Sequence, residues 1–128
     1  MSAKDELGEW GENHAAAFLA RAGYTILERN WRCQQGEIDI VAFDGRDTVF
    51  VEVKTRSSLR YGHPLEAITP QKLARLRRLA AAWCEQNPTE LTALRRRSIR
   101  IDAIGVLRRS GAVGLRLLRL RQLRAVRA

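Results

Sequence analysis

Residues 36–54, GEIDIVAF-DGRD-TVFVEVK, decide the fold. Residues 37–43 and 48–54 are two runs rich in β-branched and aromatic side chains, and such runs favour strands. The four residues between them, 44–47, contain Asp-Gly, which is typical of a tight turn between antiparallel strands. The sequence therefore predicts a β-hairpin, and we expect this hairpin to carry both the core of the fold and its chemistry.

The register of this hairpin follows if residues 44–47 form the turn. Asp39 then faces Glu52, and Glu37 faces Lys54, because antiparallel partners keep a constant sum of residue numbers. Side chains alternate between the two faces of a strand, so these four charged residues share one face. We expect a wholly apolar opposite face made by Ile38, Ile40, Ala42, Val49, Val51 and Val53.

Asp39 and Glu52 would repel each other in this register. Cross-strand partners have Cβ atoms about 5 Å apart, where two like charges cost roughly 3 kcal/mol at an effective dielectric constant near 20. Lys54 on the same face offsets part of this cost. A divalent cation would offset more, and hard oxygen ligands suit Mg²⁺ or Mn²⁺. The alternative is a solvated face whose charges merely alternate, and a β-bulge would also separate the two carboxylates.

A helix and a strand are predicted before the hairpin. Residues 8–22 are rich in alanine and are followed by Gly23, which is typical of a helix C-terminus. Residues 24–33 alternate in polarity and predict a strand. Glu12 lies two turns before Leu19, so we expect it to lean toward the core, where a carboxylate needs a partner such as a cation. The alternative is that Glu12 only stabilises the helix N-terminus through the dipole.

A second helix and a fourth strand are predicted after the hairpin. Residues 55–68 predict a loop, and Thr69 suits the N-cap of a helix over residues 70–86, which begins with proline. Residues 98–107 predict a strand parallel to the third strand, because a helical crossover connects the two. Residues 115–126 fit either a strand or a helix. We therefore expect an α/β fold with an α-β-β-β-α-β core, in which helices flank a mixed central sheet.

Charge is distributed unevenly along the 128 residues, whose net charge is +9. Residues 1–54 hold six basic and ten acidic side chains, whereas residues 55–128 hold seventeen basic and four acidic ones. A basic half attracts polyanions, and nucleic acid is the commonest polyanion in a cytoplasm. Two alternatives remain: arginine content that reflects genome composition, and a basic interaction module that docks on an acidic partner or a membrane surface.

Composition argues against several classes of protein. No apolar run approaches the roughly 20 residues that a membrane span needs. The first residues lack the apolar segment of a secretory signal, so we expect a cytoplasmic protein. Cys33 and Cys84 do not form a disulfide framework or a zinc-site pattern. His14 and His63 are isolated in the sequence, and nothing supports a serine or cysteine nucleophile.

Several short motifs together resemble the YraN family of small bacterial proteins, over residues 5–107. These motifs are GxxGE at 8–12, Asn30, GEID at 36–39, FVEVKxR at 50–56, Gly62, Lys72 and Ile101-Asp102. That family is similar to the restriction-endonuclease-like PD-(D/E)xK superfamily and, within it, to archaeal Holliday junction resolvases. The sequence departs from the superfamily motif at Ile38, which stands in the place of the proline.

The residue pattern and the resemblance converge on metal-dependent hydrolysis of phosphodiester bonds. The ligands of Mg²⁺ or Mn²⁺ would be Asp39, Glu52, Glu12 and the carbonyl of Val53. Lys54 would orient or activate a water molecule, and Glu37 would tune Lys54. The same reading gives a single nuclease-like domain over residues 1–107 and a basic C-terminal extension over residues 108–128.

Contacts with the substrate are expected from the basic half. The candidates are Arg56, Ser57, Arg60 and Tyr61 in the loop, and Gln71, Lys72, Arg75 and Arg78 along one side of the second helix. Arginine, hydroxyl and aromatic side chains suit phosphate contact and base stacking. The resemblance favours DNA over RNA, branched or single-stranded substrates, and a homodimer. The alternatives are a solvated helix face and a nucleic-acid-binding protein that keeps the nuclease fold without turnover.

Overall fold

The computed structural model describes residues 3–60, 62–87 and 98–123. Its elements are α1 (Ala3–Arg21), β1 (Thr25–Cys33), β2 (Gly36–Phe43), β3 (Thr48–Arg56), the short 3-10 helix η1 (Pro64–Ala67), α2 (Pro70–Gln86), β4 (Ile99–Arg109) and β5 (Ala112–Leu123). This order confirms the α-β-β-β-α-β core that the sequence predicts. Of the two alternatives for residues 115–126, the described part forms a strand, which pairs with β4.

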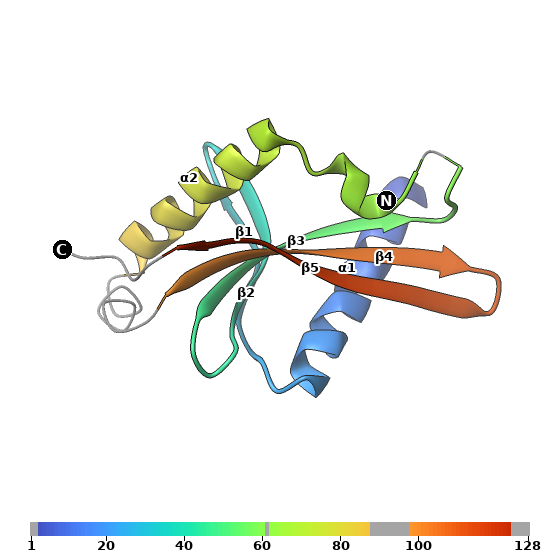
Figure 1. Cartoon of the computed structure of the whole chain (residues 1–128), viewed down its shortest axis with the longest axis horizontal. Helices are drawn as coiled ribbons and strands as arrows, with labels where there is room; N and C mark the ends of the chain where they lie inside the picture. The colour runs from blue at the N-terminus through green and yellow to red at the C-terminus, as the bar shows by residue number, and fades with distance from the viewer. Residues whose placement is uncertain (1–2, 61, 88–97, 124–128) are drawn as a thin grey trace.

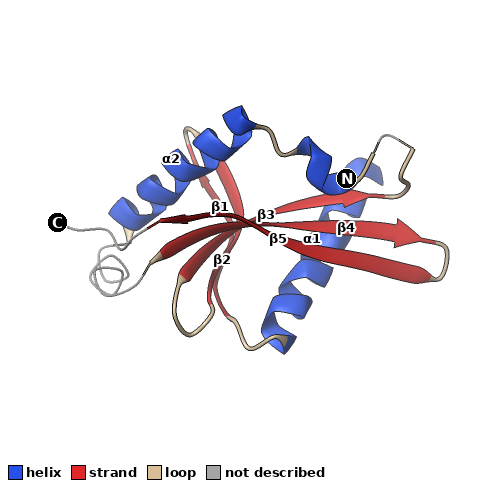
Figure 2. Cartoon of the chain, viewed as in Figure 1, coloured by secondary structure: helices blue, strands red, loops and turns tan. Residues whose placement is uncertain are grey.

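The five strands form one mixed sheet in the order β1-β2-β3-β4-β5. β3 and β4 are parallel, as predicted from the helical crossover, and the other neighbours are antiparallel. The two helices lie on opposite faces of this sheet (Figures 1 and 2). The central strands are therefore covered on both sides, which explains why their sequences are apolar on both faces.

Two apolar clusters fill the space between the sheet and the helices. Under α1 the buried residues are Ala15, Ala16, Leu19, Ile40, Ala42, Val49, Val51, Ile104 and Val106. Under α2 they include Leu76, Leu79, Ala80, Trp83, Trp31, Ile38, Val41, Phe50, Ile99 and Ile101. Burial of each large apolar side chain contributes about 1.5–3 kcal/mol. No helix in the described part of the chain is long and apolar enough to cross a membrane.

Some helices and strands begin or end at other residues than the sequence predicts. α1 begins at Ala3 rather than at residue 8, since Asp5 and Glu6 in its first turn favour a helix N-terminus. The N-cap is confirmed, because the side chain of Thr69 accepts a hydrogen bond of 3.1 Å from the N–H of Lys72. β3 continues to Arg56, so the connection between β3 and α2 is shorter than predicted.

A buried ionic network ties β4 to the turn between β2 and β3. Arg100 is only 2% exposed and donates to Asp102 at 3.0 Å, to Asp44 at 2.7 Å and to the Tyr24 hydroxyl at 2.7 Å. The N–H of Asp47 also donates to Asp44 at 2.6 Å. Burial opposes ionisation of Asp44, but these hydrogen bonds hold its pKa below the ordinary value. Asp102, part of a motif in the sequence, therefore serves the fold.

Candidate functional site

The predicted hairpin register holds from the turn as far as the pair Ile40–Val51, where the ladder between β2 and β3 ends. Two residues further along β3, the N–H of Val53 donates a 2.7 Å hydrogen bond to the carboxylate of Asp39. A side chain thus replaces the partner that Val53 would otherwise have in β2, while Val53 still pairs with Ile104 of β4. Asp39 therefore lies at the gap where the two strands part, instead of pairing with Glu52 as the sequence predicts.

The alternation of faces breaks at the same level of β1 and β2. Ile40 packs under α1, whereas Ile38 and its β1 partner Trp31 pack under α2. Asn30 in β1 has a φ of 53°, a left-handed conformation that asparagine adopts more readily than most residues. This break explains why Ile38 departs from the face predicted for it, and Asp39 is the residue at which the break occurs.

Asp39 titrates far from its ordinary range. Burial is the largest cause that raises its pKa to about 7, and repulsion by Glu52 is the next. Glu12 and Glu37 add smaller repulsions, whereas the hydrogen bond from Val53 acts in the opposite direction. Three neighbouring carboxylates therefore repel the ionised Asp39 carboxylate at the gap. A cation bound at the gap would relieve this repulsion on Asp39.

Glu52 lies between two lysines on the α2 side. It is 8% exposed, and its Oε1 atom is 3.2 Å from Nζ of Lys54 and 3.0 Å from Nζ of Lys72. Lys54 lies two residues along β3, whereas Lys72 comes from the first turn of α2. Burial lowers the pKa of Lys54, Lys72 lowers it further, and Glu52 acts in the opposite direction. The structure thus brings two cationic groups to one carboxylate.

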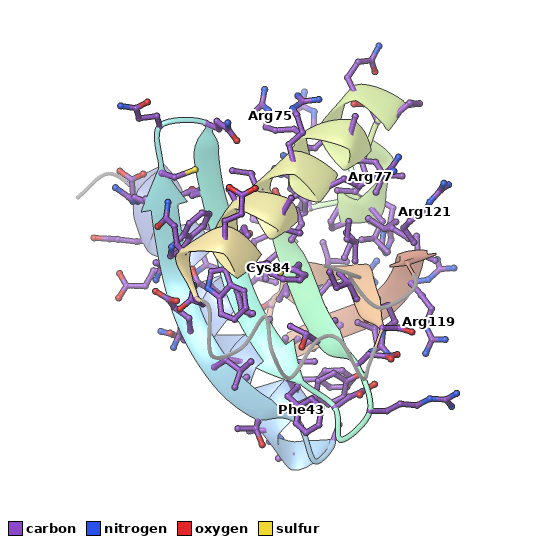
Figure 3. The ribbon with its side chains drawn as sticks, turned by 90° about the vertical axis from the view of Figure 1, so that its left-hand side faces the viewer. Phe43, Arg75, Arg77, Cys84, Arg119 and Arg121 are labelled. Atoms are coloured by element: carbon purple, nitrogen blue, oxygen red, sulfur yellow. The ribbon has the colours of Figure 1, made fainter. Side chains whose placement is uncertain are left out.

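Among the residues predicted along one side of α2, Lys72 departs from the exposed surface of the helix. Lys72 faces Glu52, whereas Gln71, Arg75 and Arg78 are exposed. Arg75 lies toward the turn between β1 and β2, and Figure 3 shows Arg77 on the opposite flank of the helix. Lys72 therefore belongs to the carboxylate site rather than to the outer surface of the helix.

The loop residues predicted to contact substrate are mostly exposed. Ser57 and Arg60 are exposed, and Arg56 is half-buried and donates to the Thr55 carbonyl at 3.0 Å. Tyr61 lies outside the described residues. Since β3 ends at Arg56, two residues after Lys54, the loop begins near the carboxylate site.

Glu12 and Glu37 take different positions around the gap. Glu12 is 9% exposed, as its predicted inward orientation requires, and it accepts a 3.2 Å hydrogen bond from Nε of Arg29. Glu37 is exposed and accepts from Nε of Arg32 at 3.1 Å, rather than facing Lys54 as the sequence predicts. The β1 ladder supplies that partner, since Arg32 and Glu37 are a cross-strand pair. Glu12 thus belongs to the buried site, and Glu37 lies at its rim.

Gly11 lets α1 approach β3 closely. The residue is buried, and a Cβ atom at this position would overlap the side chain of Thr55. We expect Gly11→Ala to destabilise the protein by about 1–3 kcal/mol through overpacking, although alanine gains up to about 1 kcal/mol of helix propensity over glycine. Urea denaturation measures this change in the free energy of unfolding.

Gly8 is the matched control for this substitution, because no atom beyond its chain neighbours and the adjacent helix backbone lies within 4 Å of the place that its Cβ would take. Gly8→Ala should therefore show only the propensity gain, up to about 1 kcal/mol. A Gly11→Ala variant as stable as Gly8→Ala would contradict the close contact between α1 and β3.

The donors at this site could hold a hard divalent cation. Asp39, Glu52 and Glu12 offer carboxylate oxygens, which Mg²⁺ and Mn²⁺ prefer. Among the residues that the structure describes, no three Asp, Glu, His or Cys side chains are grouped closely enough to hold a metal ion. Mg²⁺ in nucleotide and phosphate sites is commonly held by only one or two carboxylates, with water and substrate phosphate as the remaining ligands. The residues present therefore fit such an ion.

Comparison with known proteins assigns the chain to a family. The model of "Uncharacterised protein family UPF0102" matches residues 11–106, which include every carboxylate and lysine of the site. The chain belongs to the UPF0102 family. This membership fits the YraN resemblance inferred from the motifs.

Relatives within the UPF0102 family align over most of the chain. A UPF0102 protein of Leifsonia xyli subsp. xyli is 58% identical over 107 residues, which are 84% of this chain and 86% of the relative. One from Beutenbergia cavernae is 52% identical over 120 residues, 93% of this chain and 98% of the relative. One from Frankia casuarinae is 56% identical over 88 residues, 69% of this chain and 75% of the relative.

Proposed function

We propose that this UPF0102 member is a metal-dependent endonuclease that hydrolyses phosphodiester bonds in branched or single-stranded DNA. The observation that carries the proposal is the position of Asp39 at the gap between β2 and β3, with Glu52 and Lys54 on the adjoining strand. These residues form the pattern that resembles PD-(D/E)xK nucleases. The mixed sheet between two helices agrees with that resemblance, and symmetric cutting of a junction would favour a homodimer with two sites.

The metal in this proposal is Mg²⁺ or Mn²⁺, held by Asp39 and Glu52 with Glu12 and the Val53 carbonyl as further ligands. When bound, it would neutralise charge on the phosphate and lower the pKa of a water molecule. The N–H of Val53 orients the Asp39 carboxylate through their 2.7 Å hydrogen bond. Lys54, whose Nζ atom lies 3.2 Å from Glu52, would orient the attacking water and stabilise the negative charge that develops.

Lys72 extends this arrangement from the other side of Glu52. Because its Nζ atom contacts Glu52 at 3.0 Å, it places a positive charge where the phosphate would gain negative charge during hydrolysis. Lys72→Met should lower kcat for DNA cleavage about 10²-fold with a smaller change in KM. Steady-state kinetics on a labelled substrate separates the two constants.

The matched control for Lys72 is Arg78→Met, which removes an exposed charge from the same helix. This variant should change KM and the salt dependence of binding while leaving kcat within a few-fold of the wild type. If Lys72→Met raised KM alone, Lys72 would be a binding residue like those on the surface of α2, and its proposed role at Glu52 would be wrong.

The test of the proposed function is a cleavage panel. Labelled single-stranded, duplex, flap and four-way-junction DNA, and a single-stranded RNA, are incubated with the protein and Mg²⁺, Mn²⁺ or EDTA. The proposal expects cleavage that needs a metal and is fastest on single-stranded or branched DNA. Equal rates on every DNA would contradict the structural preference, and absence of cleavage with either metal would contradict the nuclease.

A second candidate function is nucleic-acid binding without turnover. It is favoured by the two ion pairs that already engage Glu52 and by the absence, within the described residues, of a grouped set of three metal ligands. Under this alternative, the panel would show salt-sensitive binding of DNA in EDTA and no product with any metal.

A further inference from the structure

β5 is an edge strand with a basic surface. It pairs with β4 on one side, its residues include no acidic side chain, and its Arg116, Arg119 and Arg121 are exposed. Arg119 pairs across the ladder with Asp102 and attracts that buried carboxylate electrostatically. Arg116 and Arg121 form no ion pair with an acidic side chain that the structure describes, so their charges are directed to solvent.

The ladders place these two arginines on the same face as the carboxylate site. Cross-strand rows run through Lys54, Gly105 and Arg116, and through Phe50, Ile101 and Arg121. Directly paired residues point to the same face of a sheet. Both arginines therefore lie on the α2 face, which Lys54 and Glu52 share, and β5 lies two strand spacings from β3, or about 10 Å across the strands.

A third arginine joins them from α2. Leu120 of β5 packs against the apolar cluster under α2, so the strand and the helix lie side by side. Figure 3 shows Arg77 on the flank of α2 that faces β5, on the same side of the molecule as Arg121. Arg77 is exposed and forms no ion pair with a described acidic side chain. We call Arg77, Arg116 and Arg121 the basic edge.

The chemistry of the basic edge favours a phosphodiester backbone. Guanidinium groups bind phosphate oxygens in bidentate fashion and remain charged at every physiological pH. Leu117 and Leu118 of the same strand are also exposed, but a docking surface for lipid would carry exposed aromatic side chains as well. No aromatic residue that the structure describes is exposed. Arginine on an edge strand also discourages pairing with another sheet, but that role alone predicts no affinity for polyanions.

We propose that the basic edge binds the DNA backbone of a segment that flanks the scissile phosphate. The choice of DNA rests on the proposed function. A backbone held about two strand spacings from Glu52, on the same face, would extend the contact beyond the loop after β3. The protein would then select substrates with duplex next to the cleavage point, such as the arms of a branched molecule.

The test measures binding without chemistry. Fluorescence anisotropy in EDTA follows a labelled duplex and a four-way junction at several KCl concentrations, for wild type and for Arg116→Ala/Arg121→Ala. The variant should bind at least about tenfold more weakly, and the slope of log K against log[KCl] should be shallower by about two, since each lost phosphate contact removes about 0.9. Arg21→Ala/Arg46→Ala, which removes two exposed arginines outside the basic edge, is the matched control.

The possible outcomes separate this inference from the proposed function. An unchanged slope in the β5 variant, or the same loss in the control, overturns the basic edge even if the wild type cleaves DNA. Loss of binding to phosphatidylglycerol vesicles with unchanged DNA affinity overturns it in favour of a membrane surface. Wild-type protein that binds no DNA overturns both proposals, whereas the expected slope change supports the basic edge even where no product forms.

Discussion

Asp39→Asn is expected to stabilise the protein at pH 8. The wild-type carboxylate is ionised at that pH against the cost of burial and of repulsion by Glu52, which together raise its pKa to about 7. Asparagine removes the charge and keeps an oxygen that can accept the hydrogen bond from Val53. Each unit of pKa corresponds to about 1.4 kcal/mol, so the gain in the free energy of unfolding is on the order of 4 kcal/mol.

The pH dependence of wild-type stability follows from the same shift. The unfolded chain releases the proton of Asp39 near pH 4, whereas the folded protein keeps it until about pH 7. Between these values the folded state binds more protons, so stability attributable to Asp39 falls as the pH rises and then levels off above 7. The decline should be smaller in Asp39→Asn, as urea denaturation at successive pH values would show.

Exposed Glu37 supplies the control for this prediction. Glu37→Gln removes a carboxylate from the rim and should change stability by less than about 0.5 kcal/mol. An Asp39→Asn variant no more stable than wild type at pH 8 would contradict the inference that burial and repulsion by Glu52 destabilise the ionised Asp39 carboxylate. Mg²⁺ should raise the melting temperature of the wild type at pH 8 and leave that of Asp39→Asn unchanged, since a ligand stabilises only the state that binds it.

Arg100→Met is expected to have the largest effect on stability. The guanidinium is buried and donates to Asp102, which is fully buried, and to Asp44. Methionine fills much of the volume but leaves both carboxylates without their cation. Removal of one partner from a buried ion pair typically costs about 3–5 kcal/mol, and thermal or urea denaturation measures this loss.

Exposed Arg46 provides a matched substitution in the turn next to this network. Arg46→Met should cost less than about 0.5 kcal/mol, because it leaves no buried charge behind. An Arg100→Met variant within 1 kcal/mol of the wild type would show that the network does not hold β4 to the turn.

The sequence predicts much of the fold because its signals are local. The Asp-Gly turn fixes the register near Val41 and Phe50, and Thr69 followed by proline marks the start of α2. The parallel pairing of β3 and β4 follows from the length of the crossover. For residues 115–126 the sequence could not distinguish a strand from a helix, because a repeat of leucine and arginine fits both periods. Only the pairing with β4 shows that the described part, residues 115–123, is a strand.

The candidate site is less predictable because its geometry depends on neighbouring strands. The ladder ends at Ile40 and the faces change near Asn30, so Asp39 reaches the Val53 N–H instead of facing Glu52. The alternation of side chains along a strand predicts neither the end of the ladder nor the change of face. Likewise, helix periodicity gives the side of α2 that carries Lys72 but not its contact with Glu52, which depends on where the helix begins relative to β3.

The most direct test of the central claim compares wild type with Asp39→Asn. Both proteins are incubated with a labelled four-way junction and single-stranded DNA in Mg²⁺ or Mn²⁺, and the initial rate of cleavage is measured. The account predicts cleavage by the wild type and a rate at least about 10³-fold lower for Asp39→Asn, which remains folded. Metal-dependent cleavage at equal rates by both proteins, or no cleavage by the wild type, would contradict it.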